Sequence, residues 1–316
     1  MRKNLLDPAT IAKISRLALK INSPAKGTMT GIHKSVFYGS SIEFSEHKEY
    51  NQGDEIKFID WKVYAKSDKY YVKKYEDETN LKCYILIDKS DSMKYSGPQF
   101  IVSADEADKT KEERKNGNGE ELSKLDYAAQ LGATLAYTLL NQQDSVGLVT
   151  FNEKIKRYIP PRSNMAHLHI ILDELSTVKE DGKTNLAHVM NELSEKIKGR
   201  GLIIVISDLL DEDEEVLKHL KLFRSRKHDV IVFHLLHSDE VNLPFDRLTH
   251  FKELEGGEME LADPKLIREE YMLQIENYVN NFKMRSRENE IDYYFIDTDD
   301  PLDKVVTRFL FRRKRF

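Results

Sequence analysis

The chain has 316 residues, a length that is generous for one domain and short for two, and it carries a formal net charge of −5 with 33% charged residues. This acidic balance excludes a general affinity for nucleic acid, and the single cysteine, Cys83, excludes an internal disulfide or a thiol metal cluster. Because it has no apolar run of about eighteen residues and no signal-type segment near its start, we expect a cytoplasmic protein without a transmembrane segment, at most peripheral to the membrane.

The first 79 residues predict a short helix and then an irregular arm. Apolar residues recur with helical spacing between Pro8 and Ile21. Polar stretches follow, and aromatic side chains alternate with charged ones from Trp61 to Glu78. Such a pattern can stack nucleic-acid bases, but acidic residues intervene here, so we expect short strands and turns that pack on the main domain.

Residues 80–316 predict a single α/β domain. Short apolar runs alternate with helical patterns, and this alternation is typical of a doubly wound, mostly parallel sheet. The predicted parallel strands are Lys82 to Asp88, Ser145 to Phe151, Gly201 to Ser207, Asp229 to Leu236 and Ile291 to Asp297. An antiparallel edge strand is expected at Ile155 to Ile159, ended by Pro160-Pro161.

Side chains that carry oxygen follow the predicted strand that ends at Asp88. Ser90 and Ser92 stand at alternate positions after it, so all three can turn their oxygens toward one point. Mg²⁺ prefers oxygen ligands in near-octahedral geometry, and these three alone would hold it weakly. Two further candidates stand at element boundaries: Thr184, which precedes a helical pattern, and Asp208, which ends an apolar run. Open parallel sheets bind ligands outside the carboxyl ends of their strands, so we expect all five side chains to form one metal site.

A plainer explanation is that Asp88 and Asp208 merely cap helices or end strands. Two aspartates alone would favour that explanation, whereas five oxygen-bearing positions in order favour the metal site. The set Asp-x-Ser-x-Ser, Thr, Asp resembles the metal-ion-dependent adhesion site of von Willebrand factor A domains. That resemblance implies a non-catalytic Mg²⁺ site with Mn²⁺ as an alternative metal, in which a partner's acidic side chain fills the open coordination position. Asp91 departs from the commonest motif residue, and we expect it to point away from the ion.

A second resemblance lies in the segment before the predicted sheet. Residues Gly53 to Lys66, with the sequence GDEIKFIDWKVYAK, resemble the signature segment of the bacterial DUF58 family, and Phe44 to Tyr50 also fits that family. There an extended arm precedes an A-type domain with the metal motif, and the resemblance covers nearly the whole chain from Gly31. It implies an adaptor rather than an enzyme, with a MoxR-type AAA+ ATPase as partner and a client that supplies the acidic residue.

The rival function is a metal-dependent phosphatase or phosphotransferase, because an aspartate after a hydrophobic first strand, here Asp88, can accept a phosphoryl group. Ser90 weakens this alternative, since such families usually carry a second acidic residue two positions after the first. A nucleotide-binding P-loop that ends at Gly182-Lys183-Thr184 is excluded, because Thr177 stands where a glycine is required.

Three other features have plain explanations. A zinc site needs four convergent ligands, and the histidines, His234 and His237 among them, are better explained as core or surface residues. The charged segment 96–121 is a lid or partner contact in one interpretation and a surface insertion in the one we favour. The basic residues from Arg312 to Arg315 complement the dipole of the final predicted helix, although they could also contact an anionic membrane.

Overall fold

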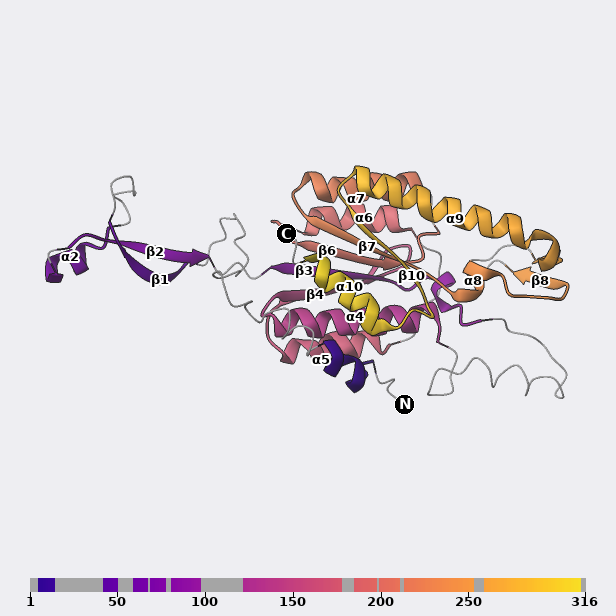
Figure 1. The fold of residues 1–316 in the computed structure, drawn as a ribbon, viewed down its shortest axis with the longest axis horizontal. Coiled ribbons are helices and arrows are strands. Elements are labelled where there is room, and N and C mark those ends of the chain that lie inside the picture. Colours follow the sequence, from indigo (N-terminus) through magenta and orange to yellow (C-terminus); the bar gives the residue numbers. More distant parts are fainter. Residues whose placement is uncertain are drawn as a thin grey trace. The chain divides into compact units, whose positions relative to one another are not determined.

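The structure, a computed structural model, describes residues 5–14, 42–50, 59–67, 69–77, 81–97, 122–177, 185–197, 199–210, 213–252 and 259–313 (Figure 1). Contacts within the chain divide it into two units. Residues 1–22 and 81–316 form one, called the sheet unit below, and residues 23–80 form the other, called the arm unit. The sequence predicted two consecutive domains, 1–79 and 80–316, and this division of contacts does not test that prediction.

The sheet unit is built on six strands in the order β10-β7-β6-β3-β4-β5. Their bounds are β3 (Lys82–Asp88), β4 (Ser145–Phe151), β5 (Ile155–Arg162), β6 (Leu202–Ser207), β7 (Asp229–Leu236) and β10 (Asp292–Asp297). Neighbouring strands are parallel except at the edge, where β5 pairs antiparallel with β4. The five predicted parallel strands and the predicted antiparallel edge strand are all present.

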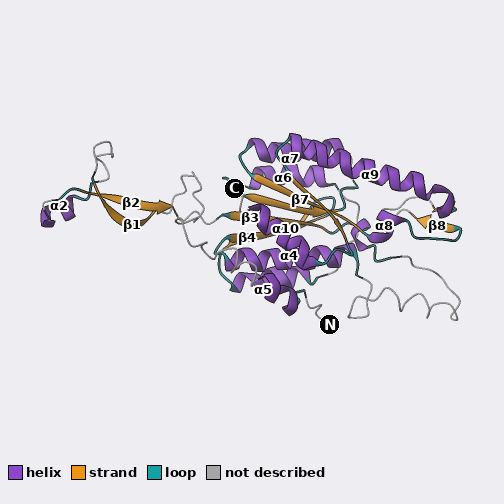
Figure 2. Ribbon diagram, viewed as in Figure 1, coloured by secondary structure: helices purple, strands orange, loops and turns teal. Residues whose placement is uncertain are grey.

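Helices cover both faces of the sheet, as Figures 1 and 2 show. One face carries α4 (Lys124–Asn141), α5 (Ala166–Leu175) and α10 (Leu302–Arg313), and the other carries α6 (Leu186–Lys196), α7 (Asp213–Ser225) and α9 (Pro264–Glu288). Two hydrophobic clusters result, with Ile85 and Ile87 in the first and Tyr84 and Leu86 in the second. Both faces of the strands are therefore apolar, and the predicted doubly wound α/β fold is confirmed.

Among its described residues, the sheet unit also contains four shorter elements and a helix near the start of the chain. The shorter elements are the 3₁₀ turn η2 (Ser92–Lys94), the helix α8 (Ser238–Asn242) and the antiparallel hairpin of β8 (Thr249–Lys252) and β9 (Met259–Ala262). Residues 8–14 form a helix in the predicted place, and the side chains of Leu5 and Ile14 are buried in the first hydrophobic cluster. The rest of that predicted helix, up to Ile21, lies outside the described residues.

The predicted end of the edge strand at Pro160-Pro161 is wrong, since β5 continues to Arg162. Proline is tolerated at sheet edges and at bulges, because a ladder hydrogen bond is missing there in any case. The register between β4 and β5 shifts here, with both prolines opposite Gly147. A Cβ atom at Gly147 would lie 2.7 Å from the carbonyl oxygen of Ile159 and 3.0 Å from the nitrogen of Pro161. Glycine therefore permits this close approach of the two strands.

The arm unit contains a two-stranded antiparallel sheet and a short helix. Its elements are β1 (Ile42–Glu49), α2 (Trp61–Ser67) and β2 (Tyr71–Asp77). The strands match the prediction, but the helix was not predicted. Asp60 explains it, because its carboxylate accepts a hydrogen bond from the backbone N–H of Val63 at 3.3 Å, as a helix-capping residue does. Tyr64 in this helix stacks on Tyr70, with ring centroids 4.5 Å apart.

No helix in the described ranges is long and apolar enough to cross a membrane. Cys83 is buried within β3, as predicted for a core residue. Further sequence predictions fall on residues outside the described ranges: the start of the signature segment (residues 53–58), residues 98–121 of the charged segment, Thr184, and the basic residues that follow Arg313.

Candidate functional site

Asp88 is the last residue of β3, and Asp208 follows the end of the neighbouring strand β6. After β3 the chain moves to β4 on one side, and after β6 it moves to β7 on the other side. Such a divergence leaves a crevice at the carboxyl ends of the strands, where open α/β sheets bind their ligands. Two of the predicted metal ligands therefore flank the switch point of this sheet.

The carboxylate of Asp88 is fully buried, and both of its oxygens accept hydrogen bonds. Oδ1 accepts one from the backbone N–H of Ser90 at 2.9 Å, and Oδ2 accepts one from the hydroxyl of Ser207 at 2.7 Å. Burial is the main cause that raises the pKa of Asp88 to about 7, and the charge of Asp208 adds to it, whereas the hydrogen bonds from Ser207 and Ser90 oppose the rise. An ionised Asp88 is therefore costly here unless a cation compensates it.

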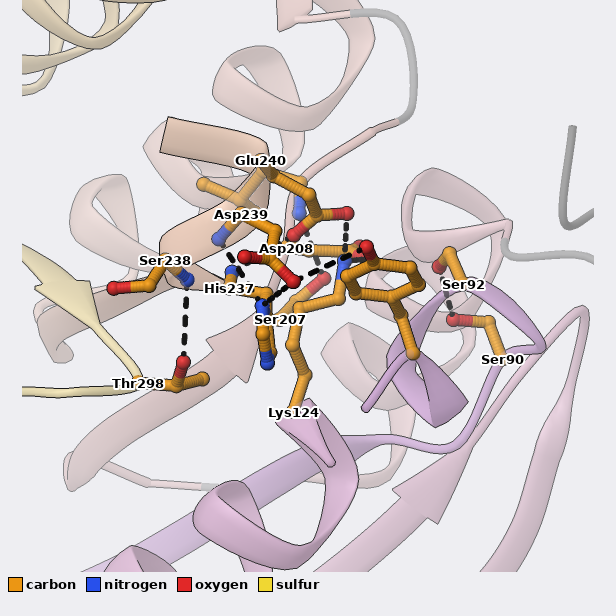
Figure 3. Close-up of polar contacts among 12 residues, drawn as sticks. Ser90, Ser92, Lys124, Ser207, Asp208, His237, Ser238, Asp239, Glu240 and Thr298 are labelled. Carbon is orange, nitrogen blue, oxygen red and sulfur yellow. Dashed lines mark hydrogen bonds and ion pairs between the residues drawn. The ribbon is translucent and has the colours of Figure 1, made fainter. Parts of the chain in front are cut away.

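Ser90 and Ser92 follow Asp88 and are both buried. Their hydroxyl oxygens lie 3.0 Å apart. A dashed line joins them in Figure 3, so the alternation after the strand brings the two hydroxyls together. Asp91 between them is partly exposed and forms an ion pair with Lys94 at 2.7 Å. The expectation that Asp91 points away from the ion stays a prediction beside this ion pair.

Lys124, which lies outside the predicted motif, adds a positive charge to this site. Its side chain is fully buried, and its ammonium nitrogen lies 2.8 Å from Oδ2 of Asp208 and 2.7 Å from Oε1 of Glu240 (Figure 3). Burial lowers the pKa of Lys124, but the negative charges of Asp208 and Glu240 outweigh this effect, so the pKa is raised overall. Oδ1 of Asp208 is also buried, and it has no hydrogen-bond partner among the described residues.

One signal in the sequence could have identified Lys124. The hydroxyl of Ser123 accepts a hydrogen bond from the backbone N–H of Asp126 at 3.0 Å and caps α4, so Lys124 is the first residue of that helix. A cation in the first turn opposes the helix dipole. The adjacent Leu125 is buried as well, so the lysine lies on a helix end that enters the core. A buried cation in that position requires carboxylate partners.

Helix α8 holds Glu240 in place beside Lys124. Oε2 of Glu240 accepts a hydrogen bond from the backbone N–H of His237 at 2.8 Å, which forms part of a capping box at the start of α8. The backbone carbonyl of Glu240 accepts a hydrogen bond from the hydroxyl of Tyr271 on α9 at 2.7 Å. Figure 3 shows the α8 side chains next to Asp208 and Lys124. Glu240, one of the two carboxylates that bind the ammonium group, is thus fixed by its surroundings.

The donor set fits a hard cation. Asp88, Ser90 and Ser92 present only oxygen atoms, and the unpartnered Oδ1 of Asp208 is a further oxygen without a hydrogen bond from the described chain. Lys124 already neutralises part of the negative charge, so an ion at this site would compensate mainly Asp88. The structure therefore brings together four of the five predicted ligands at one end of the sheet.

Thr184, the fifth predicted ligand, is not among the described residues. Its neighbour Asn185 caps α6, because its side-chain oxygen accepts a hydrogen bond from the N–H of His188 at 2.9 Å. The described ranges contain no group of three or more His, Cys, Asp or Glu side chains suited to a metal ion. The predicted set consists of two carboxylates and three hydroxyls, so it is a site of a different kind and stays a prediction.

Two of the histidines named above have structural roles. His234 is fully buried in β7, where its Nδ1 lies 2.6 Å from the hydroxyl of Tyr293, and burial lowers the pKa of His234 to about 4. His237 caps α8, because its Nδ1 accepts a hydrogen bond from the backbone N–H of Asp239 at 3.1 Å. His234 is thus a core residue and His237 a helix cap, and neither needs a role as a zinc ligand to explain its position.

A family model described as "Protein of unknown function DUF58" matches residues 46–105 and 107–279, which is more than half of the chain. The chain belongs to the DUF58 family. Two mycobacterial proteins also match this DUF58 chain, the uncharacterized protein Rv1480 of Mycobacterium tuberculosis (strain ATCC 25618 / H37Rv) and the uncharacterized protein Mb1516 of Mycobacterium bovis. Each is 22% identical over 247 residues, which cover 77% of this chain and 70% of the relative.

Two solved structures are similar to the DUF58 chain at low identity. The conserved hypothetical protein BatB from Bacteroides thetaiotaomicron is 15% identical, with coverage of 75% of this chain and 100% of that chain and a TM-score of 0.46. An aerotolerance-related membrane protein from Bacteroides fragilis NCTC 9343 is 17% identical, with coverage of 74% and 98% and a TM-score of 0.45. At these TM-scores the two structures say nothing about the function of this chain. The fold assignment rests on the strand order of the sheet.

Proposed function

We propose that this DUF58 protein is a non-catalytic, metal-dependent protein-binding adaptor with a von Willebrand A-like domain. Asp88, Ser90, Ser92, Thr184 and Asp208 would hold a Mg²⁺ ion, which Mn²⁺ could replace. The observation that supports this proposal most directly is the buried oxygen cluster at the switch point, where burial and Asp208 raise the pKa of Asp88 to about 7. A buried site that disfavours its own carboxylate charge is one that a cation stabilises.

A bound ion would supply positive charge and an open coordination position for an acidic side chain of a partner. The chain's own residues divide the remaining work. Ser90 and Ser92 present neutral oxygens, and Asp88 is oriented by the hydrogen bond that it accepts from Ser207 at 2.7 Å. Oδ2 of Asp208 accepts a hydrogen bond from Lys124 at 2.8 Å, whereas Oδ1 has no hydrogen-bond partner among the described residues. Asp208 would therefore face the ion with Oδ1, and we propose that this contact passes through a water molecule.

The partner proposed for this site is a MoxR-type AAA+ ATPase, together with a client that carries the acidic residue. This part of the proposal depends on the resemblance to DUF58 proteins rather than on geometry. The chain itself offers no P-loop sequence, so ATP hydrolysis would belong to the partner.

The alternative function, a phosphatase or phosphotransferase that uses Asp88, gains no support from this geometry. A phosphoryl acceptor must be ionised and must reach its substrate. The Asp88 side chain is fully buried, and its Oδ2 accepts a hydrogen bond from Ser207. Turnover of a generic phosphate ester that disappears in Asp88→Ala would nevertheless favour the alternative over the adaptor.

Calorimetric titration with Mg²⁺ tests the metal site. We expect the wild type to bind one ion, and we expect Asp88→Ala and Thr184→Ala to weaken the affinity by at least about tenfold, or about 1.4 kcal/mol. Asp91→Ala is the matched control, because Asp91 lies between Ser90 and Ser92 in sequence, is not a proposed ligand and forms an ion pair with Lys94. Equal Mg²⁺ affinity in all four proteins would contradict the proposed site.

Binding of the partner is tested separately. The immobilised chain is exposed to purified MoxR-type ATPase from the same organism in Mg²⁺ and in EDTA, with Asp88→Ala alongside the wild type. The adaptor proposal predicts ATPase binding to the wild type in Mg²⁺ and loss of at least most of it in EDTA and in the variant. ATPase binding that is equally strong in EDTA and in Asp88→Ala would rule out the metal as the link between the two proteins.

A further inference from the structure

Helix α9 carries apolar side chains on a surface that no described part of the chain covers. Along its 25 residues only Pro264, Phe282 and Ser286 are buried. Leu273 is 57% exposed and Met272 is 41% exposed, although both lie in the middle of the helix. Large apolar side chains that remain exposed together, rather than singly, often mark an interaction site.

These side chains form one wall of an open groove with a volume of about 520 Å³. The groove lies among three elements, α8, α9 and the edge strand β10. Its apolar lining is Val241 from α8, Phe295 from β10, and Met272, Leu273, Ile275 and Val279 from α9. A concave apolar surface of this kind is suited to apolar side chains of a partner.

Two glutamates, Glu269 and Glu276, complete the lining of the groove. They are seven residues apart on α9, so they lie on the same side of the helix, separated by two turns or roughly 10 Å. Neither forms an ion pair with a described residue. Between Arg268 and Lys283 the helix has no basic residue, and the guanidinium of Arg268 is held by the carbonyl oxygens of Leu243 and Phe245 at 3.0 and 2.8 Å. Among the described residues that line the groove, two are therefore acidic and none is basic.

The groove is held in place by hydrogen bonds from α9 to its surroundings. The hydroxyl of Tyr271 donates to the carbonyl of Glu240 at 2.7 Å, and that of Tyr278 donates to the carbonyl of Leu209 at 2.5 Å. Together with the hydrogen bonds that Arg268 donates to Leu243 and Phe245, these contacts fix α9 at three positions along the groove. A preformed surface loses little conformational freedom on binding, which favours affinity.

We propose that this groove binds an amphipathic helical segment of a partner protein, with apolar side chains that enter the groove and Lys or Arg side chains that pair with Glu269 and Glu276. A helix laid along α9 meets it with side chains at intervals of three, four and seven residues, which matches the seven-residue spacing of the glutamates. Nucleic acid and anionic lipid would both be repelled by those carboxylates. This surface is separate from the proposed metal ligands, so the inference goes beyond the proposed function.

A displayed library of random helical peptides tests the inference on the full chain. Peptides are selected on the wild type and depleted on Leu273→Asp, which changes an exposed side chain and should leave the fold intact by circular dichroism. We expect the retained peptides to carry an apolar stripe and a net positive charge, with basic residues at about seven-residue spacing. Retained peptides that are neutral or acidic, or no enrichment over Leu273→Asp, would overturn the proposal.

The best retained peptide is then synthesised and its affinity measured in EDTA. We expect Leu273→Asp and the double variant Glu269→Lys, Glu276→Lys each to weaken binding by at least about tenfold. Met284→Asp is the matched control, because Met284 is 58% exposed on the same helix but does not line the groove, and its affinity should match the wild type. Equal loss in the control, or concentration-dependent dimerisation that Leu273→Asp abolishes, would overturn the proposal, the second result in favour of another copy of this chain.

Discussion

Two buried lysines of the sheet unit differ in what surrounds them, although both have almost no exposed surface. Lys89 follows β3, and its ammonium binds Oε1 of Glu174 at 3.1 Å and the carbonyl oxygen of Thr177 at 3.2 Å, both at the end of α5. Lys124 instead lies between Asp208 and Glu240 beside the candidate metal ligands. Lys89 therefore joins elements of the fold, whereas Lys124 acts as a built-in counter-ion of the site.

Replacing Lys124 by methionine should destabilise the protein most strongly when no metal is present. In EDTA, Lys124→Met leaves the buried carboxylate of Asp208 and the partly buried carboxylate of Glu240 without their cation, and we expect the free energy of unfolding to fall by about 3–5 kcal/mol. Mg²⁺ should restore much of that loss, because an ion can take over the positive charge. Urea denaturation in EDTA and in Mg²⁺ measures both effects.

Lys89→Met is the matched control for this experiment. It should also lower the free energy of unfolding, because Glu174 loses its ion-pair partner and keeps, among the described residues, only the hydrogen bond from Thr150, but Mg²⁺ should not restore it. Equal recovery in the two variants, or no recovery in Lys124→Met, would show that Lys124 does not stand in for a cation at the proposed site.

Asp88 should make stability depend on pH in the absence of metal. Its pKa is about 4 in an unfolded chain and about 7 in the folded protein. Between these values the folded state binds more protons than the unfolded state, so the free energy of unfolding decreases as the pH rises from about 4 to about 7. In EDTA the urea midpoint of the wild type should fall across this window, and Asp88→Asn should remove most of the fall. Parallel curves for the two proteins would refute this assignment.

At the scale of secondary-structure elements, the junction of β4 and β5 depends on one glycine. Gly147→Ala places a Cβ atom 2.7 Å from the backbone oxygen of Ile159, and backbone atoms on a paired strand cannot easily move away. We expect a loss of about 1–3 kcal/mol in the free energy of unfolding, measured by chemical denaturation.

Gly132→Ala on α4 serves as the comparison for Gly147→Ala. There the new Cβ atom would meet Cδ1 of Ile87 at 2.6 Å, the far end of a flexible side chain that can rotate. Alanine also stabilises a helix relative to glycine by roughly 1 kcal/mol. We therefore expect Gly132→Ala to lower the free energy of unfolding by less than Gly147→Ala does. A larger loss in Gly132→Ala would contradict the close approach of β4 and β5 as the cause.

Much of the sheet could be predicted because its strands are buried on both faces. Apolar runs such as Leu202 to Ile206 stand out in any sequence, and polar side chains that follow them indicate the carboxyl end of the sheet. The end of β5 was predicted wrongly, since Pro160-Pro161 lies in an irregular edge pairing that depends on the partner strand. The helix α2 was missed because its seven residues, capped by Asp60, are too few to show a clear periodicity.

Within the candidate site, the sequence identified the oxygen-bearing residues but not their charge balance. Asp88, Ser90 and Ser92 are neighbours in the chain, so their convergence follows from local geometry. The contact of Lys124 with Asp208 spans 84 positions and depends on how α4 enters the core. Only its place in the first turn of a buried helix hinted at such a partner.

For the whole molecule, the sheet unit should fold without the arm unit. Its two hydrophobic clusters consist of residues from 1–22 and 81–316 alone, as far as the chain is described. Replacing residues 23–80 by a short Gly-Ser linker should leave the helical circular dichroism signal cooperative on heating and the Mg²⁺ affinity unchanged. A loss of cooperative unfolding would show that the sheet unit needs the arm unit.

The burial of Leu5 and Ile14 makes the sheet unit discontinuous in sequence, with the arm unit as an insertion. Lys13 in the helix of residues 8–14 contacts Asp303 of α10 at 3.2 Å, so segments from near the two ends of the chain meet. This contact joins residues that are 290 positions apart in the sequence, so it closes a long loop. The entropy of closing so long a loop grows only slowly with length, by about 0.6 kcal/mol for each doubling. The ion pair between this helix and α10 can therefore form only after the chain has been synthesised as far as residue 303.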